Sequence, residues 1–311
     1  MTSRISRAAA SLAVLAIAAA IMAGCGSSNN NTTSAPASTG GGAASTGATS
    51  SGVDQKVASE VPAAIKSKGT LTVAADATYA PNEFIGSDGK TVEGMDADLA
   101  QALAGVMGLK AKVVNATFDS IIPGLAAHKY DLGMSSFTDT KEREKTVNFV
   151  TYFSAGTSFY EKASGGPAIT DLSSLCGTTV AVEKGTTQQA DSTGQSKKCT
   201  SAGKKPVKVL TFTDQNGANL AITSGRAQVG MADSPVADYQ VKKSSGQFKL
   251  VGKPYGTAPY GIALPKDLKL EQPVLDALKV LMSNGKYMEI LKKWGIESGA
   301  ISNPQINGAI S

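Results

Sequence analysis

Arg143 is the residue whose type and setting first suggest chemistry. It closes the stretch "SSFTDTKER" at residues 135–143, in which small hydroxyl side chains lead into charged ones. A guanidinium presents a planar fork of N–H donors that pairs with a carboxylate through two parallel hydrogen bonds. Arg143 is therefore predicted to bind an anion. The alternative is a surface arginine paired with Glu142 or Glu144.

The residues before Arg143 predict the start of a helix. Asp139 and Glu142 stand at the spacing of a capping box, which places Arg143 in the first turn. The backbone N–H groups from Ser136 to Thr138 would then share the bound anion with the guanidinium.

Asp233 is the acidic counterpart of Arg143. It ends the apolar run "AQVGMAD", where its carboxylate would receive an ammonium group or cap the turn that begins at Ser234 and Pro235. The stretch "EKGTTQQ" places Thr186 and Thr187 at the start of another predicted helix. Such a start favours anions, although it is also a common capping arrangement.

The ring side chains divide into two groups. Tyr79 and Phe118 follow predicted strands, where they would form aromatic walls around a ligand or pack in the core. His128, the single histidine, lies in a helix-to-strand corner and is predicted to be a solvent-facing loop residue.

Short apolar strands alternate with helices along the body of the chain. The predicted strands cover residues 69–76, 110–118, 130–136, 178–185, 207–212, 227–233 and 259–265. The predicted helices cover residues 95–108, 119–129 and 218–225, a segment that opens near residue 185, and a pair within 273–294. This alternation predicts an α/β fold with a largely parallel sheet.

Several polar and aromatic side chains stand where these strands end. In open α/β sheets, ligands bind outside the carboxyl ends of the strands. The side chains at those positions are Asp76, Phe118, Ser135 and Ser136 in the first half of the body, and Glu183 and Asp233 in the second. They predict one site shared by two lobes.

The N-terminus predicts an export signal. Arg4 and Arg7 precede an apolar run at residues 8–22 that is too short for a comfortable membrane span. The sequence "IMAGC" resembles the lipobox of bacterial lipoproteins, with Met22 where most carry Leu. It implies a signal peptide over 1–24 and a lipid on Cys25. The alternative is an ordinary secretory signal.

The segment that follows predicts a flexible tether over residues 25–55. Ser, Thr, Gly, Asn and Ala dominate it, and such a composition buries too little apolar surface to fold.

Charge and cysteine content exclude several classes of protein. The net charge of +5 is spread along the chain and only 5% of residues are aromatic, which argues against a nucleic-acid partner. Cys176 and Cys199 form an even pair in an oxidising compartment and predict a disulfide. Two thiols and one histidine lack the spacing of a zinc site, so we expect neither a metal nor a cofactor.

Five motifs together resemble one family. "LTVAADATYAPNEF", "GMDADLAQALA", "FDSIIPGLAAHKYDLGMSSFTDTKEREKTVNFV", "VAVEKGTTQ" and "GRAQVGMAD" are similar, in this order, to the polar amino-acid substrate-binding proteins of ABC importers, solute-binding family 3. The similarity runs from about residue 71 to residue 294.

The resemblance implies a periplasmic-binding-protein-like fold of type II. Two α/β lobes, joined by two strand crossovers, would close over an amino acid in the cleft between them. The implied limits are 56–155 plus 258–297 for lobe 1, 156–257 for lobe 2, and 298–311 for a C-terminal tail. The implied partner is a membrane permease, served by a monomeric binding protein anchored by lipid to the outer face of the bacterial cell membrane.

The resemblance also implies roles for individual residues. Arg143 would hold the α-carboxylate, with help from Thr138 and the helix start at Thr187, and Asp233 would accept the α-ammonium group with Ser136 nearby. The full set of implied ligand-binding residues is Asp76, Tyr79, Phe118, Ser135, Ser136, Thr138, Arg143, Glu183, Thr186, Thr187 and Asp233.

The ligand side chain would meet two acids, Asp76 and Glu183. A pair of carboxylates favours a cationic side chain such as that of arginine, lysine or ornithine. If Lys184 or another base neutralises Glu183, a neutral ligand such as glutamine fits instead. Asn82 stands where many relatives have Phe, which changes the shape of the pocket.

Two other functional classes compete with the binding protein. Some proteins of this fold are dehydratases. In such an enzyme, Asp76 and Glu183 of this chain would serve as the acid and the base. The chain has no nucleophile-elbow motif, however, and we expect no catalytic residue. A sensor ectodomain would need a transmembrane segment and an output domain.

Overall fold

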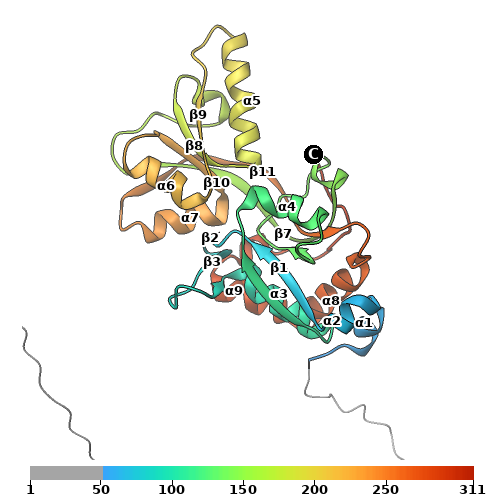
Figure 1. The fold of residues 1–311 in the computed structure, drawn as a ribbon. Helices are drawn as coiled ribbons and strands as arrows, with labels where there is room; N and C mark the ends of the chain where they lie inside the picture. Colours follow the sequence, from blue (N-terminus) through green and yellow to red (C-terminus); the bar gives the residue numbers. More distant parts are fainter. Residues whose placement is uncertain (1–51) are drawn as a thin grey trace, which may run out of the picture. The chain divides into compact units, whose positions relative to one another are not determined.

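One eight-stranded sheet forms the centre of the protein in the computed structural model, which describes residues 52–311 (Figure 1). Its strand order is β5-β1-β6-β11-β7-β10-β8-β9. The strands are β1 (Thr70–Ala75), β5 (Lys110–Asn115), β6 (Leu132–Gly133), β7 (Val147–Lys162), β8 (Thr179–Glu183), β9 (Lys208–Phe212), β10 (Val229–Asp233) and β11 (Phe248–Pro265). Every predicted strand is present, because short apolar runs bounded by turn residues suit the strands of a parallel sheet. The inner strands β8 and β10 are almost wholly buried, whereas the edge strands β5 and β9 are partly exposed.

Two long strands, β7 and β11, join the two ends of this sheet. They pair antiparallel with each other over 16 and 18 residues, while β1 pairs parallel with β5 and β6, and β8 pairs parallel with β9 and β10. Their register shifts near Tyr255, Ala258 and Gly261. Such bulges bend a strand pair, so β7 and β11 form the two predicted crossovers at a bend.

The first lobe packs its helices around β1, β5 and β6. Its helices are α1 (Gln55–Glu60), α2 (Ala63–Lys68), α3 (Met95–Val106), α4 (Phe118–Ala126), α8 (Glu271–Ser283) and α9 (Lys286–Trp294). A small second sheet contains β2 (Thr78–Tyr79), β3 (Glu83–Ile85) and β4 (Val92–Glu93). Leu71 of β1, Leu99 and Leu103 of α3 and Leu278 of α8 are fully buried in one cluster. These apolar helix faces explain why the predicted helices form.

The second lobe surrounds β8, β9 and β10 with α5 (Thr187–Ser201), α6 (Gln215–Thr223) and α7 (Ser234–Lys243), and has its own core (Figure 1). Ile222 and Val236 pack with Tyr160 on one face, and Val182 and Met231 pack on the other. Ala155 pairs with Ala258 beside a register shift. The lobe limits 56–155 plus 258–297 and 156–257 stay a prediction that this bend supports.

The helix predicted at Arg143 is wrong. Only one 3-10 turn, η1 (Arg143–Lys145), forms there before β7 begins at Val147. Asp139 caps nothing; its backbone N–H instead donates to the Pro259 carbonyl of β11, 2.8 Å away. Pairing with β11 on one side and the start of β7 on the other leave no length for an α-helix. Conversely, α7 begins where the sequence suggested only a turn.

The membrane-related predictions concern other residues. The signal peptide, Cys25 and most of the tether lie outside the described residues. Between residues 52 and 311, none of the helices has the length and apolar character needed to span a membrane.

The predicted disulfide is present between Cys176 and Cys199, with the two Cα atoms 5.6 Å apart. It ties the segment after η2 (Leu172–Leu175) to the last turns of α5. The half-cystine Cys199 is buried beside Val207 and Leu175 in the core of the second lobe.

We expect the bridge to stabilise the protein by restricting the unfolded chain. Replacing both half-cystines, with Cys176→Ser and Cys199→Ser, should lower the free energy of unfolding by about 3 kcal/mol, because the cysteines are 23 residues apart. Urea unfolding of the variant and of the oxidised protein measures the difference. Equal midpoints for the oxidised and the reduced parent protein would contradict this stabilising role.

Candidate functional site

A cavity with about 290 Å³ of empty space lies between the two lobes. All eleven residues predicted for the site line it: Asp76, Tyr79, Phe118, Ser135, Ser136, Thr138, Arg143, Glu183, Thr186, Thr187 and Asp233. Two further residues, Glu83 and Gln188, complete the lining. The sheet explains this assembly. Within each lobe the parallel strands, β1 with β6 and β8 with β10, end at one edge, and antiparallel pairing through β7 and β11 makes the two sets run in opposite directions, so that their carboxyl ends meet at the cavity from opposite sides.

Arg143 enters the cavity with its guanidinium unpaired to any carboxylate among the described residues. Its Nη1 donates to the Thr138 carbonyl at 2.8 Å, and its Nη2 donates to the Gly185 carbonyl at 2.9 Å. The guanidinium lies 5.3 Å from the centres of the stacked Phe118 and Phe137 rings. Loss of solvent around it lowers the pKa of Arg143 to about 10.

The surface alternative for Arg143 does not hold. Glu142 pairs with Lys145, and Glu144 pairs with Lys141 at 3.0 Å. Both glutamates thus have lysine partners, which leaves the charge of Arg143 directed at the cavity.

Thr138 and Ser136 differ in what their backbones offer. Thr138 faces Tyr260 across an isolated antiparallel bridge, and the bonds to β11 are made by its neighbours, through the Phe137 carbonyl and the Asp139 N–H. The N–H and carbonyl of Thr138 therefore turn away from β11, and the carbonyl reaches Arg143. The N–H of Ser136 was expected to be available for an anion, but it donates to Asp96 at 2.8 Å.

Asp233 is held on the opposite side by three groups. Gln188 Nε2 donates to its Oδ1 at 2.7 Å, the Tyr260 hydroxyl donates to its Oδ2 at 2.7 Å, and its own N–H donates to the Tyr79 hydroxyl oxygen at 2.8 Å. Although Asp233 occupies the N-cap position of α7, its side chain makes no capping bond. Burial raises its pKa, while these hydrogen bonds and Arg143 oppose the rise.

Asp76 and Glu183 form an acidic end of the cavity. The Asp76 carboxylate accepts from the Thr78 hydroxyl at 2.7 Å and from the Phe118 N–H at 3.0 Å. Glu183 is buried, and its Oε1 has no hydrogen-bond partner. Desolvation raises the pKa of Glu183 well above its ordinary value, and Asp76 adds to the rise. Lys184 does not neutralise Glu183, because it pairs with Asp119 at 2.8 Å.

Glu83 is the acid that the sequence did not reveal. It is fully buried and accepts from the Ser135 hydroxyl at 2.9 Å, while the Ser136 hydroxyl is shared between Glu83 and Asp96. Desolvation raises the pKa of Glu83, and Asp96 raises it further. The signal available was an acid directly after the Asn82 that replaced the expected Phe. Asn82 itself lies behind the cavity and donates to the Ser136 hydroxyl at 2.8 Å.

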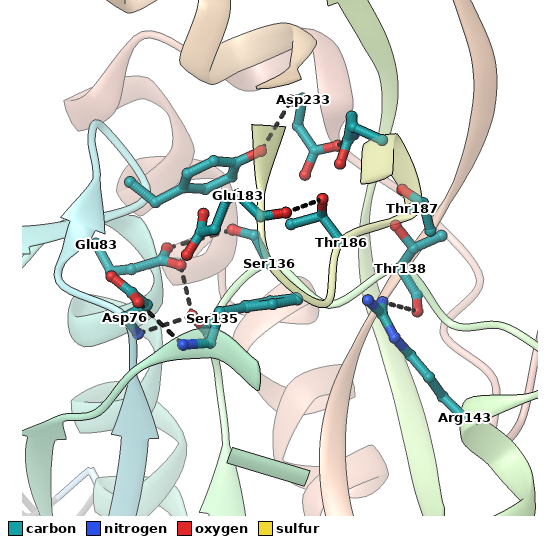
Figure 2. A pocket seen from close by; sticks show the side chains of 13 residues that line it. Asp76, Glu83, Ser135, Ser136, Thr138, Arg143, Glu183, Thr186, Thr187 and Asp233 are labelled. Carbon is teal, nitrogen blue, oxygen red and sulfur yellow. Dashed lines mark hydrogen bonds between the residues drawn. The ribbon is translucent and has the colours of Figure 1, made fainter. Parts of the chain in front are cut away.

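The site is therefore divided by charge. Figure 2 shows Arg143, Thr138 and Thr187 on one side of the cavity and Asp76, Glu83 and Glu183 on the other, with Asp233 apart from both groups. The remaining threonine, Thr186, caps α5 by accepting from the Gln189 N–H, so its predicted capping role is met while it also lines the cavity. His128 is half-exposed beside Asp267 and does not line the cavity.

Contacts across the cleft hold the two lobes together. Arg143 of the first lobe bonds Gly185 of the second, Asp119 pairs with Lys184, and Tyr79 bonds Asp233. The Gln215 N–H also donates to the Thr78 hydroxyl at 3.2 Å. The structure therefore shows the lobes closed on the cavity.

Known sequences resemble this chain over most of its length. Residues 71–297 match the family described as bacterial extracellular solute-binding proteins, family 3. The arginine-binding protein ArgT of Corynebacterium glutamicum is 35% identical over 248 residues, which cover 79% of this chain and 81% of that protein.

Solved structures resemble it as well. An ancestral arginine-binding protein, bound to arginine, is 35% identical with a TM-score of 0.66 and covers 73% of this chain and 98% of its own. The same kind of ancestral protein bound to glutamine is 34% identical, with a TM-score of 0.66 and the same coverage. The ancestral amino acid-binding protein AncCDT-1, a precursor of cyclohexadienyl dehydratase, is 34% identical with a TM-score of 0.64 and covers 74% of this chain and 97% of its own.

The buried Glu183 predicts a pH-dependent stability for the protein without ligand. Its pKa is raised above the ordinary value of 4.5, so the folded state binds more protons than the unfolded state above pH 4.5, and stability falls as pH rises. Glu183→Gln removes this loss. At pH 7 it should raise the free energy of unfolding, because a neutral amide carries no such penalty.

Urea unfolding of ligand-stripped protein between pH 5 and pH 8 measures this effect. Glu60→Gln, on the exposed end of α1, is the matched control and should follow the parent protein. A Glu183→Gln variant that is less stable than the parent at pH 7 would mean that Glu183 is ionised and satisfied by a partner.

Proposed function

The chain belongs to the bacterial extracellular solute-binding proteins, family 3, and on that basis we propose that it captures a free cationic amino acid, with L-arginine favoured over lysine and ornithine. The ligand would be delivered to a membrane permease of the ABC importer type. Relatives named for arginine binding support this choice.

The observation that carries the proposal is the charge division of the cavity. Among residues 52–311, one half-buried guanidinium without a carboxylate partner faces buried carboxyl groups without a base. Buried charges cost free energy unless they are paired. An amino acid with a cationic side chain brings one carboxylate and two cations, which is the set of charges that the cavity lacks.

The α-groups of the ligand would be bound where the lobes meet. We assign the α-carboxylate to Arg143, with the Thr138 N–H and the start of α5 at Thr187 as further donors, since a helix N-terminus favours an anion. We assign the α-ammonium group to Asp233, whose carboxylate is already oriented by Gln188 and Tyr260.

The side chain of the ligand would extend toward Asp76, Glu83 and Glu183. A guanidinium or ammonium group there would lower the pKa of Glu183, and the carboxyl group would release its proton as the cation binds. Tyr79 and Phe118 would form the walls beside the aliphatic part. Glutamine is the second candidate, because an amide hydrogen-bonds protonated acids and the ancestral relative was solved with glutamine bound.

Binding and closure would be coupled. Arg143 belongs to the first lobe and Asp233 to the second, so a ligand that bonds both favours the closed state by its differential affinity. The bulges in β7 and β11 supply the bend at which the lobes would move. The proposed lobe limits remain 56–155 plus 258–297 and 156–257.

The N-terminal sequence suits a protein that is exported and anchored to the cell membrane. The family is described as extracellular, which supports export. We propose that the signal peptide over 1–24 is removed, that Cys25 carries a lipid, and that residues 25–55 tether a monomeric binding domain. The support for the lipid is the resemblance of the sequence "IMAGC" to a lipobox.

We propose that the protein binds its ligand without turning it over. The relatives named for arginine binding support a transport role. The similarity to AncCDT-1, a precursor of cyclohexadienyl dehydratase, is the reason to test for an enzyme. Incubation with prephenate-type substrates tests the alternative. Product formation that Glu183→Gln abolishes would favour the enzyme.

Loss of Arg143 should abolish the grip on the α-carboxylate. Arg143→Ala should weaken L-arginine binding at least about 100-fold, since hydrogen bonds to charged groups contribute about 1.5–3 kcal/mol each. Calorimetric titration of ligand-stripped protein measures the dissociation constant. Arg226→Ala is the matched control, because Arg226 is exposed and lies over the Phe212 ring. If L-arginine and the other free amino acids all fail to bind the parent protein, the proposal is wrong.

Cation binding should depend on pH through the acidic end. L-arginine affinity should rise between pH 5.5 and pH 8, because Glu183, with its raised pKa, must lose a proton when the cation binds. Glu183→Gln should weaken L-arginine binding about tenfold or more at pH 8 and leave a flatter profile, while L-glutamine binding changes less. Equal losses for both ligands would contradict a cation-specific role for Glu183.

A further inference from the structure

The last residues of the chain, 298–311, lie beyond the family match, which ends at residue 297. They begin within η3 (Glu297–Gly299) and return to the first lobe, where Pro304 is buried. The segment makes two separate sets of contacts, and the two sets have different consequences.

The first set covers the edge of β7. The Gln305 carbonyl accepts from the Thr151 N–H at 2.8 Å, and Ile306 forms a bridge with Val150. Asn307 completes the pairing: its N–H donates to the Phe149 carbonyl at 2.9 Å, and its side-chain oxygen accepts from the Phe149 N–H at 2.8 Å. Unpaired strand edges are commonly covered in this way, so residues 305–307 need no functional explanation.

The second set of contacts is made with the loop that carries Arg143, residues 138–146. Beyond Asn307 the chain leaves β7, and the Ala309 N–H donates to Glu144 Oε1 at 3.2 Å. The Ser311 carbonyl accepts from the Lys141 N–H at 2.8 Å. Covering the edge of β7 does not require these bonds, because the pairing already ends at Asn307.

The loop has little local structure of its own. It contains a single 3-10 turn, in which the Arg143 N–H donates to the Thr140 hydroxyl at 3.2 Å. Lys141 and Glu144, which contact the tail, flank Arg143 on either side in sequence. Ser311 also lines a second cavity together with Thr138, Thr187 and Asp233, so it lies beside the part of the site assigned to the ligand α-groups.

We propose that residues 308–311 position Arg143 by bonding the loop on both sides of it, and so determine how tightly the α-carboxylate of the ligand is held. This inference rests on the proposed function. It makes the C-terminal segment a determinant of ligand affinity although none of its residues lines the main cavity.

A chain that ends at Asn307 separates the two sets of contacts. It keeps the pairing with β7 and loses the bonds to Lys141 and Glu144. Ala309→Pro is the finer variant, because proline has no N–H for Glu144. Ile310→Ala, at a side chain that is 70% exposed, is the matched control.

Calorimetric titration with L-arginine and with L-argininamide provides the readout. L-argininamide keeps the side chain and the α-ammonium group but has no α-carboxylate for Arg143. The shortened chain should bind L-arginine about tenfold more weakly and L-argininamide nearly unchanged, because only the guanidinium–carboxylate pair is disturbed. Equal weakening for both ligands would assign residues 308–311 a general structural role, and no change for either would overturn the proposal.

Amide hydrogen exchange tests the same inference without a ligand. Removal of residues 308–311 should speed exchange in residues 138–146 and leave α5 in the second lobe unchanged. If the parent protein binds no L-arginine, the proposed function fails, and exchange in residues 138–146 still decides whether the tail orders this loop. Unchanged exchange there would overturn the positioning role.

Discussion

The constraint on which the rest of the structure depends is electrostatic: one cavity is lined by an arginine and several carboxyl groups that are not paired with each other. In the part of the chain that the structure describes, Arg143 faces it without a carboxylate partner and Glu183 faces it without a base. Burying charged groups costs free energy. Desolvation raises the pKa of Glu183 and of Asp233, which favours their neutral forms, and hydrogen-bond donors surround Asp233. A site built in this way has few options for a ligand, because the ligand must supply both signs of charge in the correct order.

The long strands β7 and β11 make that imbalance useful. A cavity of this kind inside one rigid lobe would be a permanent cost, but here its walls come from two lobes that share only these strands as crossovers. Opening would let water reach the charged groups, and closure around a zwitterion would satisfy them. The contacts between Asp119 and Lys184 and between Tyr79 and Asp233 show that the lobes also attract each other directly.

Groups behind the cavity wall give the site its precision. Ser135 and Ser136 do not simply face the ligand space; their hydroxyls bind Glu83, and the N–H of Ser136 binds Asp96. Asn82 joins the same network by donating to Ser136. The C-terminal segment reaches the Arg143 loop from another direction. Asp96, Asn82 and the C-terminal segment lie outside the lining of the main cavity, and each would fix the position of a residue that lines it.

The sequence alone determined most helices, the disulfide and the short strands β1, β5, β6, β8, β9 and β10, since their periodicity is a local signal. Strand-end polarity and the family resemblance together indicated eleven of the thirteen residues that line the cavity, because parallel strands within a lobe end at one edge. The long strand β7 was not predicted, because it depends on pairing with β10 and β11, which lie far away in the sequence. Glu83 and Gln188 escaped, because a buried acid or amide in the sequence looks like any exposed one. The tertiary structure decided that Arg143 stands on a one-turn loop rather than a helix, where pairing with β11 overrode the capping pattern. It also gave Lys184 to Asp119 and left Glu183 without a base, because the choice among neighbouring charges depends on distances that only the folded lobes establish.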